Sequence, residues 1–453
     1  MGASVSNWRL ARAVSEVGQL GVVSGTALSG VIARRLQDGD EGGHIQRALE
    51  RFPFPRMAQR VIDSFYIPGG KSATEPYRRH IMEDLEGRRE ALELCVVSNF
   101  VEVFLAREGH ENPVGINYLE KLQLPHLASI YGALLAGVAV VIMGAGIPLA
   151  VPTALAALSE HQPAEYPVTI AGLDGKAEVF NMVFNPSDFH EPGVALPSIT
   201  LPDFLPIVSS DALASILMKK ARGPIDGLII EGNLAGGHNA PPRGKATFNA
   251  DGEPVYGARD DARLSVIREM GVPFWLAGAY GTPEGMEQAL AQGAAGVQAG
   301  TAFALCEESG LVPEVRRELV KQALAGKARV YTDPLASPTG FPFKVADLKG
   351  SLSDPEIYEK RRRICDLGSL RQPYRRADGK IGYRCPAEPV AAYVAKGGKE
   401  EDTVGRKCLC NALSANAGKP QVLPDGSTEK YLITMGDDLA DIRRFCPAGQ
   451  VDF

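Results

Sequence analysis

The fold is decided by the stretch Asp226-Gly-Leu-Ile-Ile-Glu-Gly-Asn-Leu-Ala-Gly-Gly-His238-Asn-Ala-Pro-Pro-Arg-Gly244. Its apolar run, residues 227–230, has the length of one buried parallel strand. A glycine-rich loop follows, and Gly236 and Gly237 would let the backbone approach a flat ligand or a phosphate closely. His238 then stands just beyond the carboxyl end of the strand. The competing interpretation is a tight turn that carries a surface histidine.

Two later segments repeat the pattern of an apolar strand followed by glycine. Residues 272–281 read Val-Pro-Phe-Trp-Leu-Ala-Gly-Ala-Tyr-Gly, and residues 293–301 read Gly-Ala-Ala-Gly-Val-Gln-Ala-Gly-Thr. Three such units in a row fit the last strands of a β/α barrel, in which the loops after strands seven and eight usually bind phosphate. The sequence therefore predicts a TIM-type (β/α)8 barrel with its site at the carboxyl ends of the strands.

The rest of the chain supplies further strands and two additions. We expect earlier barrel strands at residues 20–24, 114–118, 138–143 and 205–209, with residues 1–327 forming the barrel. The chain starts at the carboxyl end of the expected first strand, so the barrel keeps an open edge unless another segment fills the gap. The sequence also predicts segments that a barrel does not need. A helical cap is expected at about residues 45–93, and an extra pair of strands at 168–171 and 179–183. Residues 328–453 are expected to form a C-terminal extension, with a small separate subdomain as one interpretation.

These motifs together resemble the FMN-binding barrels of the nitronate monooxygenase family, formerly called 2-nitropropane dioxygenases. The resemblance rests on residues 231–238, 277–278 and 293–303, and it extends to their relatives, the FMN-dependent enoyl-acyl-carrier-protein reductases. Residues 113–117 and 143–148 resemble the third and fourth strands of these barrels. The chain departs from the family pattern at three positions: Leu234 where Glu is usual, Ala279 where a second Gly is usual, and Ala302 where Arg is frequent.

The resemblance implies an FMN site built on the strand exits. Backbone N–H groups at Gly278, Ala279, Gly300 and Thr301, with the Thr301 hydroxyl, are expected to hold the phosphate. Gly236 and Gly237 would admit the ring system. Three more residues at strand exits are expected to contact the cofactor: Asn117, Gly144 and Ser209. Each has a simpler alternative, since an Asn can end a strand and Ser209-Ser210-Asp211 can cap a helix.

His238 is the expected catalytic residue. An imidazole at this position, with its ordinary pKa near neutrality, could stabilise an anionic nitronate or take the α-proton of a nitroalkane before FMN is oxidised by dioxygen. In the alternative reaction NAD(P)H reduces the flavin, which then reduces an enoyl thioester. A third alternative is a barrel that binds flavin or phosphate without catalysis. His126 follows Pro125 at a helix start and is expected to be a packing residue.

Composition restricts the partners. The net charge is −6 and no basic block occurs, so nucleic acid is not expected as a partner. The most apolar stretch, residues 133–150, is interrupted by Gly144, Gly146 and Pro148, which argues against a membrane span. Seven cysteines without a signal peptide indicate a reducing cytoplasm. The expected partner is a small-molecule substrate.

Four cysteines gather in the C-terminal extension: Cys365, Cys385, Cys408 and Cys410. A short segment with few apolar residues and four cysteines is typical of a zinc or iron–sulfur site. The spacing is irregular, however, and lacks the two Cys-x-x-Cys pairs of a zinc ribbon. No metal ligands are therefore assigned from the sequence, and reduced thiols in a small core are the alternative. We expect the four side chains to converge in either case.

Overall fold

The computed structural model of the protein describes residues 2–172, 176–446 and 450–451. Its centre is a curled sheet of seven parallel strands in the order β1-β2-β3-β6-β7-β8-β9. The strands are β1 (Gly21–Ser24), β2 (Val114–Leu119), β3 (Val140–Gly144), β6 (Asp203–Val208), β7 (Leu228–Glu231), β8 (Phe274–Ala277) and β9 (Gly296–Gln298). Each of the seven strands that the sequence predicts is present.

The strands read as nearly continuous apolar runs because both faces of the sheet are buried. Along β3, Val140 and Ile142 pack with Leu205 and Ile229 on the inner face of the curl. The alternate residues, Val141 and Met143, belong to the larger core beneath the helices. A parallel sheet covered on both faces selects for this pattern, and the sequence shows no polar alternation for the same reason.

The prediction of a closed eight-stranded barrel is not met. β1 and β9 are the two ends of the parallel sheet, and residues 2–6 form turns instead of a strand. Two backbone hydrogen bonds hold these residues, from Ser24 N of β1 to Ser6 O at 2.8 Å and from Gly310 N, which lies beyond β9, to Val5 O at 2.8 Å. The turn segment is therefore bonded to β1 at one edge of the sheet, and neither of these bonds reaches β9 at the other edge.

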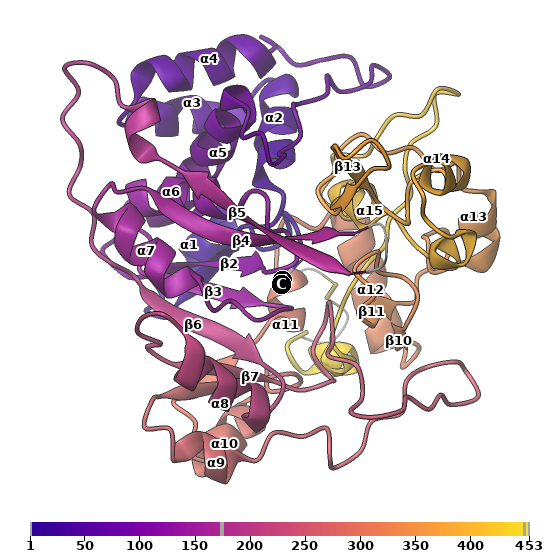
Figure 1. The fold of residues 1–453 in the computed structure, drawn as a ribbon. Coiled ribbons are helices and arrows are strands. Elements are labelled where there is room, and N and C mark those ends of the chain that lie inside the picture. Colours follow the sequence, from indigo (N-terminus) through magenta and orange to yellow (C-terminus); the bar gives the residue numbers. More distant parts are fainter. Residues whose placement is uncertain (1, 173–175, 447–449, 452–453) are drawn as a thin grey trace.

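Helices cover the outer face of the sheet, as Figure 1 shows. Those that follow strands are α2 (Leu28–Gln37), α6 (His126–Leu135), α7 (Val151–Ser159), α8 (Asp211–Lys220), α9 (Leu264–Arg268), α10 (Pro283–Ala291), α11 (Thr301–Ala304) and α12 (Pro313–Leu324). Before β1 lies α1 (Trp8–Glu16), whose N-cap Asn7 accepts backbone hydrogen bonds at 2.9 and 3.1 Å. The predicted insertion contains most of α3 (His44–Leu49), all of α4 (Pro55–Phe65) and the start of α5 (Arg89–Arg107), and η1 (Glu41–Gly43) precedes it.

A second sheet joins two distant parts of the chain. The predicted extra strands form the antiparallel pair β4 (Ala164–Ala171) and β5 (Ala177–Phe184), which η2 (Pro186–Phe189) follows. The C-terminal extension adds β12 (Gln372–Arg375) and β13 (Ile381–Arg384), and β12 runs parallel to β4 with Tyr374 opposite Ala171. The extension is thereby attached to the hairpin that leaves the parallel sheet after α7.

The C-terminal extension lies on the side toward which the strands of the parallel sheet point (Figure 1). It contains β10 (Val330–Asp333), β11 (Phe343–Ala346), α13 (Pro355–Lys360), α14 (Val390–Ala395), η3 (Glu400–Thr403), α15 (Leu409–Asn416) and η4 (Asp437–Arg444). Residues Ala346, Ile433, Met435 and Leu439 share a core with Leu319 of α12. The extension therefore covers the end of the sheet at which a site is expected.

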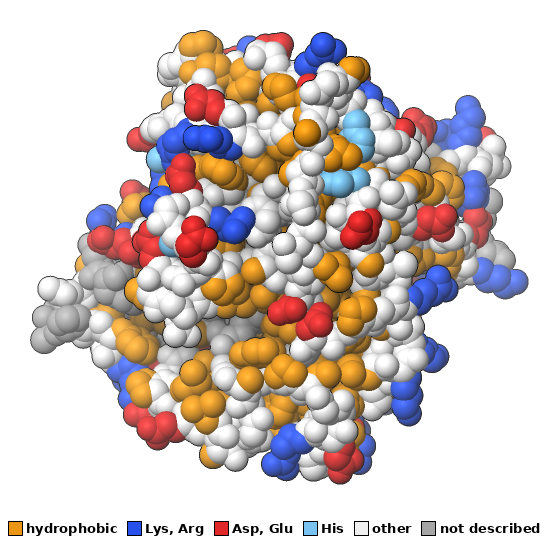
Figure 2. All heavy atoms as spheres, turned by 90° about the vertical axis from the view of Figure 1, so that its left-hand side faces the viewer, with side chains coloured by type: hydrophobic (Ala, Val, Ile, Leu, Met, Phe, Trp, Pro, Cys, Tyr) orange, Lys and Arg blue, Asp and Glu red, His pale blue; other side chains and the backbone are white. Residues whose placement is uncertain are grey.

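The surface mixes charges of both signs. On the face in Figure 2, Lys and Arg lie among Asp and Glu, with hydrophobic and uncharged side chains between them. Within the described parts of the chain, no helix combines the length and apolarity needed to cross a membrane.

Candidate active site

A cavity of about 450 Å³ opens at the carboxyl ends of β7, β8 and β9. Strand side chains such as Ile229 and Trp275 line its base, and the segment 433–438 of the extension lines the opposite side. Six of the nine residues predicted to bind the cofactor lie together in its wall: Gly236, Gly237, Gly278, Ala279, Gly300 and Thr301. The structure therefore brings most of the predicted cofactor residues to one place.

The turn after β8 is held in a conformation that favours glycine. Gly278 has φ +101° and Ala279 has φ +62°. A residue with a methyl side chain pays about 1 kcal/mol or more in conformational free energy to adopt the left-handed region. Glycine at position 279 would avoid this cost. Ala279 therefore adopts the left-handed conformation that glycine would adopt more easily, and both residues of the turn line the cavity.

The turn after β9 leads into α11. At Gly300 an added Cβ would meet no atom within 4 Å, so this backbone borders open space. Thr301 differs from the expectation, because its hydroxyl already donates to Asp438 Oδ1 at 2.6 Å and accepts from Gly436 N at 3.0 Å. Burial raises the pKa of Asp438, while the bond from Thr301 lowers it. The Thr301 hydroxyl, which was predicted to bind phosphate, is therefore hydrogen-bonded to a carboxyl group of the extension.

The glycine pair after β7 admits a protein segment. A Cβ on Gly236 would lie 2.9 Å from the carbonyl carbon of Met435, too close for any side chain. Gly237 N donates to Thr434 Oγ1 at 2.7 Å, and Gly237 O accepts from Lys344 N at 2.8 Å. Close approach thus requires glycine at Gly236, where the neighbour is the C-terminal extension, whereas Gly237 has open space and a φ of +87° that favours glycine.

His238, the predicted catalytic residue, follows Gly237 in the loop after β7, lies outside the lining of the cavity and is held by the extension. Its Nε2 lies 2.7 Å from Ser337 Oγ, and its ring packs edge-on against Phe343 with centroids 4.9 Å apart. Burial lowers the pKa of His238 to about 3, so the imidazole is neutral at physiological pH. The expectation of a pKa near neutrality was wrong, because the sequence does not show that the loops around Ser337 and Phe343 enclose the ring.

Glu231 is a site residue that the sequence reading did not assign. It ends β7, and it lines the cavity. Burial raises the pKa of Glu231 to about 7, which places its ionisation near physiological pH. The sequence did contain a signal for this residue, because Glu231 is an acidic residue directly at the carboxyl end of a barrel strand. Catalytic residues occur at such positions in these folds.

Three predicted cofactor residues lie outside the lining of the cavity. Asn117 lies within β2, opposite Ser24 of β1, and its buried Nδ2 has no hydrogen-bond partner. Gly144 is packed against Ile207, which an added Cβ would approach to 3.0 Å. Ser209 precedes Ser210, whose hydroxyl caps α8 through Leu213 N at 3.1 Å. Gly144 is therefore a packing position and Ser209 lies beside a helix cap, whereas the side-chain Nδ2 donor of Asn117 has no acceptor.

His126 has a structural environment. The side chain is buried in α6, and Nε2 lies 3.0 Å from the backbone oxygen of Glu120. Burial lowers the pKa of His126 to about 4. This environment agrees with the packing role expected from the sequence.

One segment of the chain, which includes the strands at the cavity, matches a known protein family. Residues 203–332, from the start of β6 into β10, match the family model described as nitronate monooxygenase. The match confirms the resemblance that the motifs indicate and supports an FMN-dependent oxidoreductase. No curated protein matches the sequence.

Three solved structures are similar at low identity. FabK from Thermotoga maritima has 16% identity and a TM-score of 0.45, over 98% of this chain and 88% of that chain. Nitroalkane oxidase from Streptomyces ansochromogenes has 16% identity and a TM-score of 0.39, over 92% and 94%. The enoyl reductase domain of MlnA from the macrolactin biosynthesis cluster of Bacillus amyloliquefaciens has 12% identity and a TM-score of 0.45, over 100% and 88%.

Proposed function

We propose that the protein is an FMN-dependent oxidoreductase of the nitronate monooxygenase type, which oxidises alkyl nitronates or nitroalkanes with dioxygen. One observation carries the proposal. The cavity of about 450 Å³ lies at the exits of β7, β8 and β9, and these three strands belong to the segment that matches the family model. Its size falls in the range of cofactor and small-molecule sites. Free thiols at all seven cysteines would suit a reducing cytoplasm, where we place the protein.

The wall of the cavity fits FMN at the turn after β9. The open space at Gly300, at the start of α11, leaves room for a phosphate beside backbone N–H groups. Asn117 keeps a buried Nδ2 without a partner, but it lies outside the cavity lining and supplies no contact there. Asp438 opposes an anion at Thr301, so the proposal requires this carboxyl group to be protonated or displaced when phosphate is present.

Bound FMN would supply the acceptor for the two electrons that leave the substrate. Glu231 would accept the α-proton of a neutral nitroalkane, because a carboxyl group with a pKa of about 7 is ionised in part of the molecules at neutral pH. His238 would act as a neutral hydrogen-bonding group whose orientation is set by Ser337. Proton removal would thus fall to Glu231 at the end of β7, and substrate orientation to His238 in the loop that follows.

The proposal is tested by anaerobic mixing of the purified flavoprotein with 2-nitropropane, with its preformed nitronate and with NADH, followed by flavin absorbance. We expect both nitro compounds to bleach the flavin. Glu231→Gln should slow reduction by neutral 2-nitropropane by a factor of about 10²–10⁴ and leave reduction by the nitronate nearly unchanged, because only the former needs a base.

The matched control is Glu287→Gln, which changes an exposed glutamate on α10. This variant should behave as wild type with both substrates. Rapid reduction by NADH without reduction by either nitro compound would contradict the proposal and favour a reductase.

A further inference from the structure

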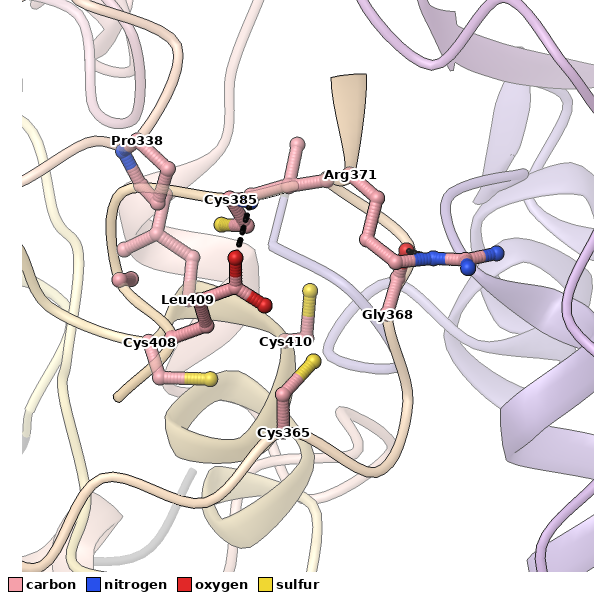
Figure 3. Close-up of a pocket in the computed structure, with 11 residues that line it drawn as sticks. Pro338, Cys365, Gly368, Arg371, Cys385, Cys408, Leu409 and Cys410 are labelled. Atoms are coloured by element: carbon pink, nitrogen blue, oxygen red, sulfur yellow. Dashed lines mark hydrogen bonds between the residues drawn. The ribbon is translucent and has the colours of Figure 1, made fainter. Parts of the chain in front are cut away.

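The four cysteines of the extension surround one small cavity. Figure 3 shows Cys365, Cys385, Cys408 and Cys410 around a common space, with Pro338 and Leu409 at its border. They come from separate elements: the loop after α13, the residue after β13, and the N-cap and first turn of α15. All four thiols are free. The irregular spacing in the sequence therefore folds into one constellation, as a cofactor with four thiolate ligands requires.

A buried cation lies beside the four thiols. The guanidinium of Arg361 is near the Cys408 thiol and is paired with the buried carboxylate of Glu429, and its Nη1 has no hydrogen-bond partner. Charge and hydrogen bonding around the sulfurs are among the properties by which proteins tune thiolate-bound iron.

The arrangement of the thiols does not match a site for a single metal ion. Four thiolates on one zinc ion, with Zn–S bonds of about 2.3 Å, lie about 3.8 Å apart in a tetrahedron. In the described residues no three His, Cys, Asp or Glu side chains are arranged closely enough to hold one metal ion. The four thiols instead line one shared cavity, and iron–sulfur clusters are held by four such thiolates around an inorganic core.

We propose that Cys365, Cys385, Cys408 and Cys410 ligate an iron–sulfur cluster. The cluster would join the α13 loop, β13 and α15, which otherwise share a small apolar contact around Cys385, Ala387 and Cys408. Pro338 borders the cluster cavity, and Ser337, the residue before it, contacts His238 at 2.7 Å. The cluster site is therefore connected through two consecutive residues to the candidate active site.

The test is metal and sulfide analysis of the full chain purified without oxygen, with and without reconstitution by ferrous iron and sulfide. We expect equal amounts of iron and acid-labile sulfide, and an electron paramagnetic resonance signal after dithionite reduction of the wild-type protein. Cys385→Ser and Cys410→Ser should lose most of the iron and sulfide. Cys446→Ser, outside the cluster and partly exposed, should keep them.

Three results would overturn the proposal: stoichiometric zinc without sulfide, no bound metal after reconstitution, or equal iron loss in the Cys446 variant. The wild-type signal decides the question even if a cysteine variant does not fold, because it needs no variant. Flavin content, measured in the same samples, separates this proposal from the proposed oxidoreductase function, since the cluster can be absent while FMN is bound.

Discussion

Replacing Glu231 by Gln should make stability less dependent on pH. The pKa of Glu231 lies at about 7 in the folded protein and at about 4.5 in an unfolded chain. Between these two values the folded state keeps a proton that the unfolded state has lost, so the stability of the wild type falls as pH rises from about 4.5 to 7. At 1.36 kcal/mol for each pH step, the loss reaches about 3 kcal/mol above pH 7.

Glutamine carries no titratable proton, so this loss is absent from the variant. The assay is urea unfolding of wild type, Glu231→Gln and the control Glu287→Gln at pH 5 and pH 8. We expect the stability of Glu231→Gln relative to wild type to increase by about 2–3 kcal/mol between the two pH values, while the control shows no such increase. A relative stability that is the same at both pH values would refute the raised pKa and the burial that causes it.

Three further variants test the site. His238→Ala should retain FMN but lower turnover by about 10²-fold in stopped-flow reduction, and wild-type reduction rates would make the residue structural. Gly300→Asp should abolish flavin retention, because it directs a carboxylate into the open space beside the turn, whereas Gly257→Asp, at another exposed glycine with no neighbouring atom, should retain it. Asp438→Asn should tighten FMN binding about tenfold in a fluorescence titration, because it removes a carboxyl group from Thr301; weaker binding would show that this carboxyl group supports the site.

The parallel strands were predictable because their signals are local. Residues 227–230 and 138–143 are short apolar runs that end in glycine, and such runs need both faces buried. The pairing of β12 with β4 was not predictable in the same way. It joins Tyr374 to Ala171 across two hundred residues of chain, and no periodicity in either segment specifies that partner. The expectation of a closed ladder was not met, because residues 2–6 form turns and not a strand.

The same distinction between local signals and distant contacts applies to the candidate site. The glycines at positions 278 and 300 mark the strand exits, and the sequence places them correctly beside one cavity. What the sequence could not provide is the C-terminal segment that enters the site from far along the chain. That segment brings Asp438 to Thr301 and Met435 to Gly236, and the neighbouring loop encloses His238. The pKa values of His238 and Glu231 follow from this enclosure and not from the residue types.

The most direct test of the central claim is the identity of the flavin. Protein purified in the dark is denatured, and the released chromophore is identified by chromatography and mass spectrometry, before and after incubation of the folded protein with FMN and FAD. Our account predicts stoichiometric FMN, since the cavity of about 450 Å³ offers one phosphate turn and no glycine-rich dinucleotide motif precedes it. Release of FAD, or no flavin bound after incubation with excess FMN, would contradict the account.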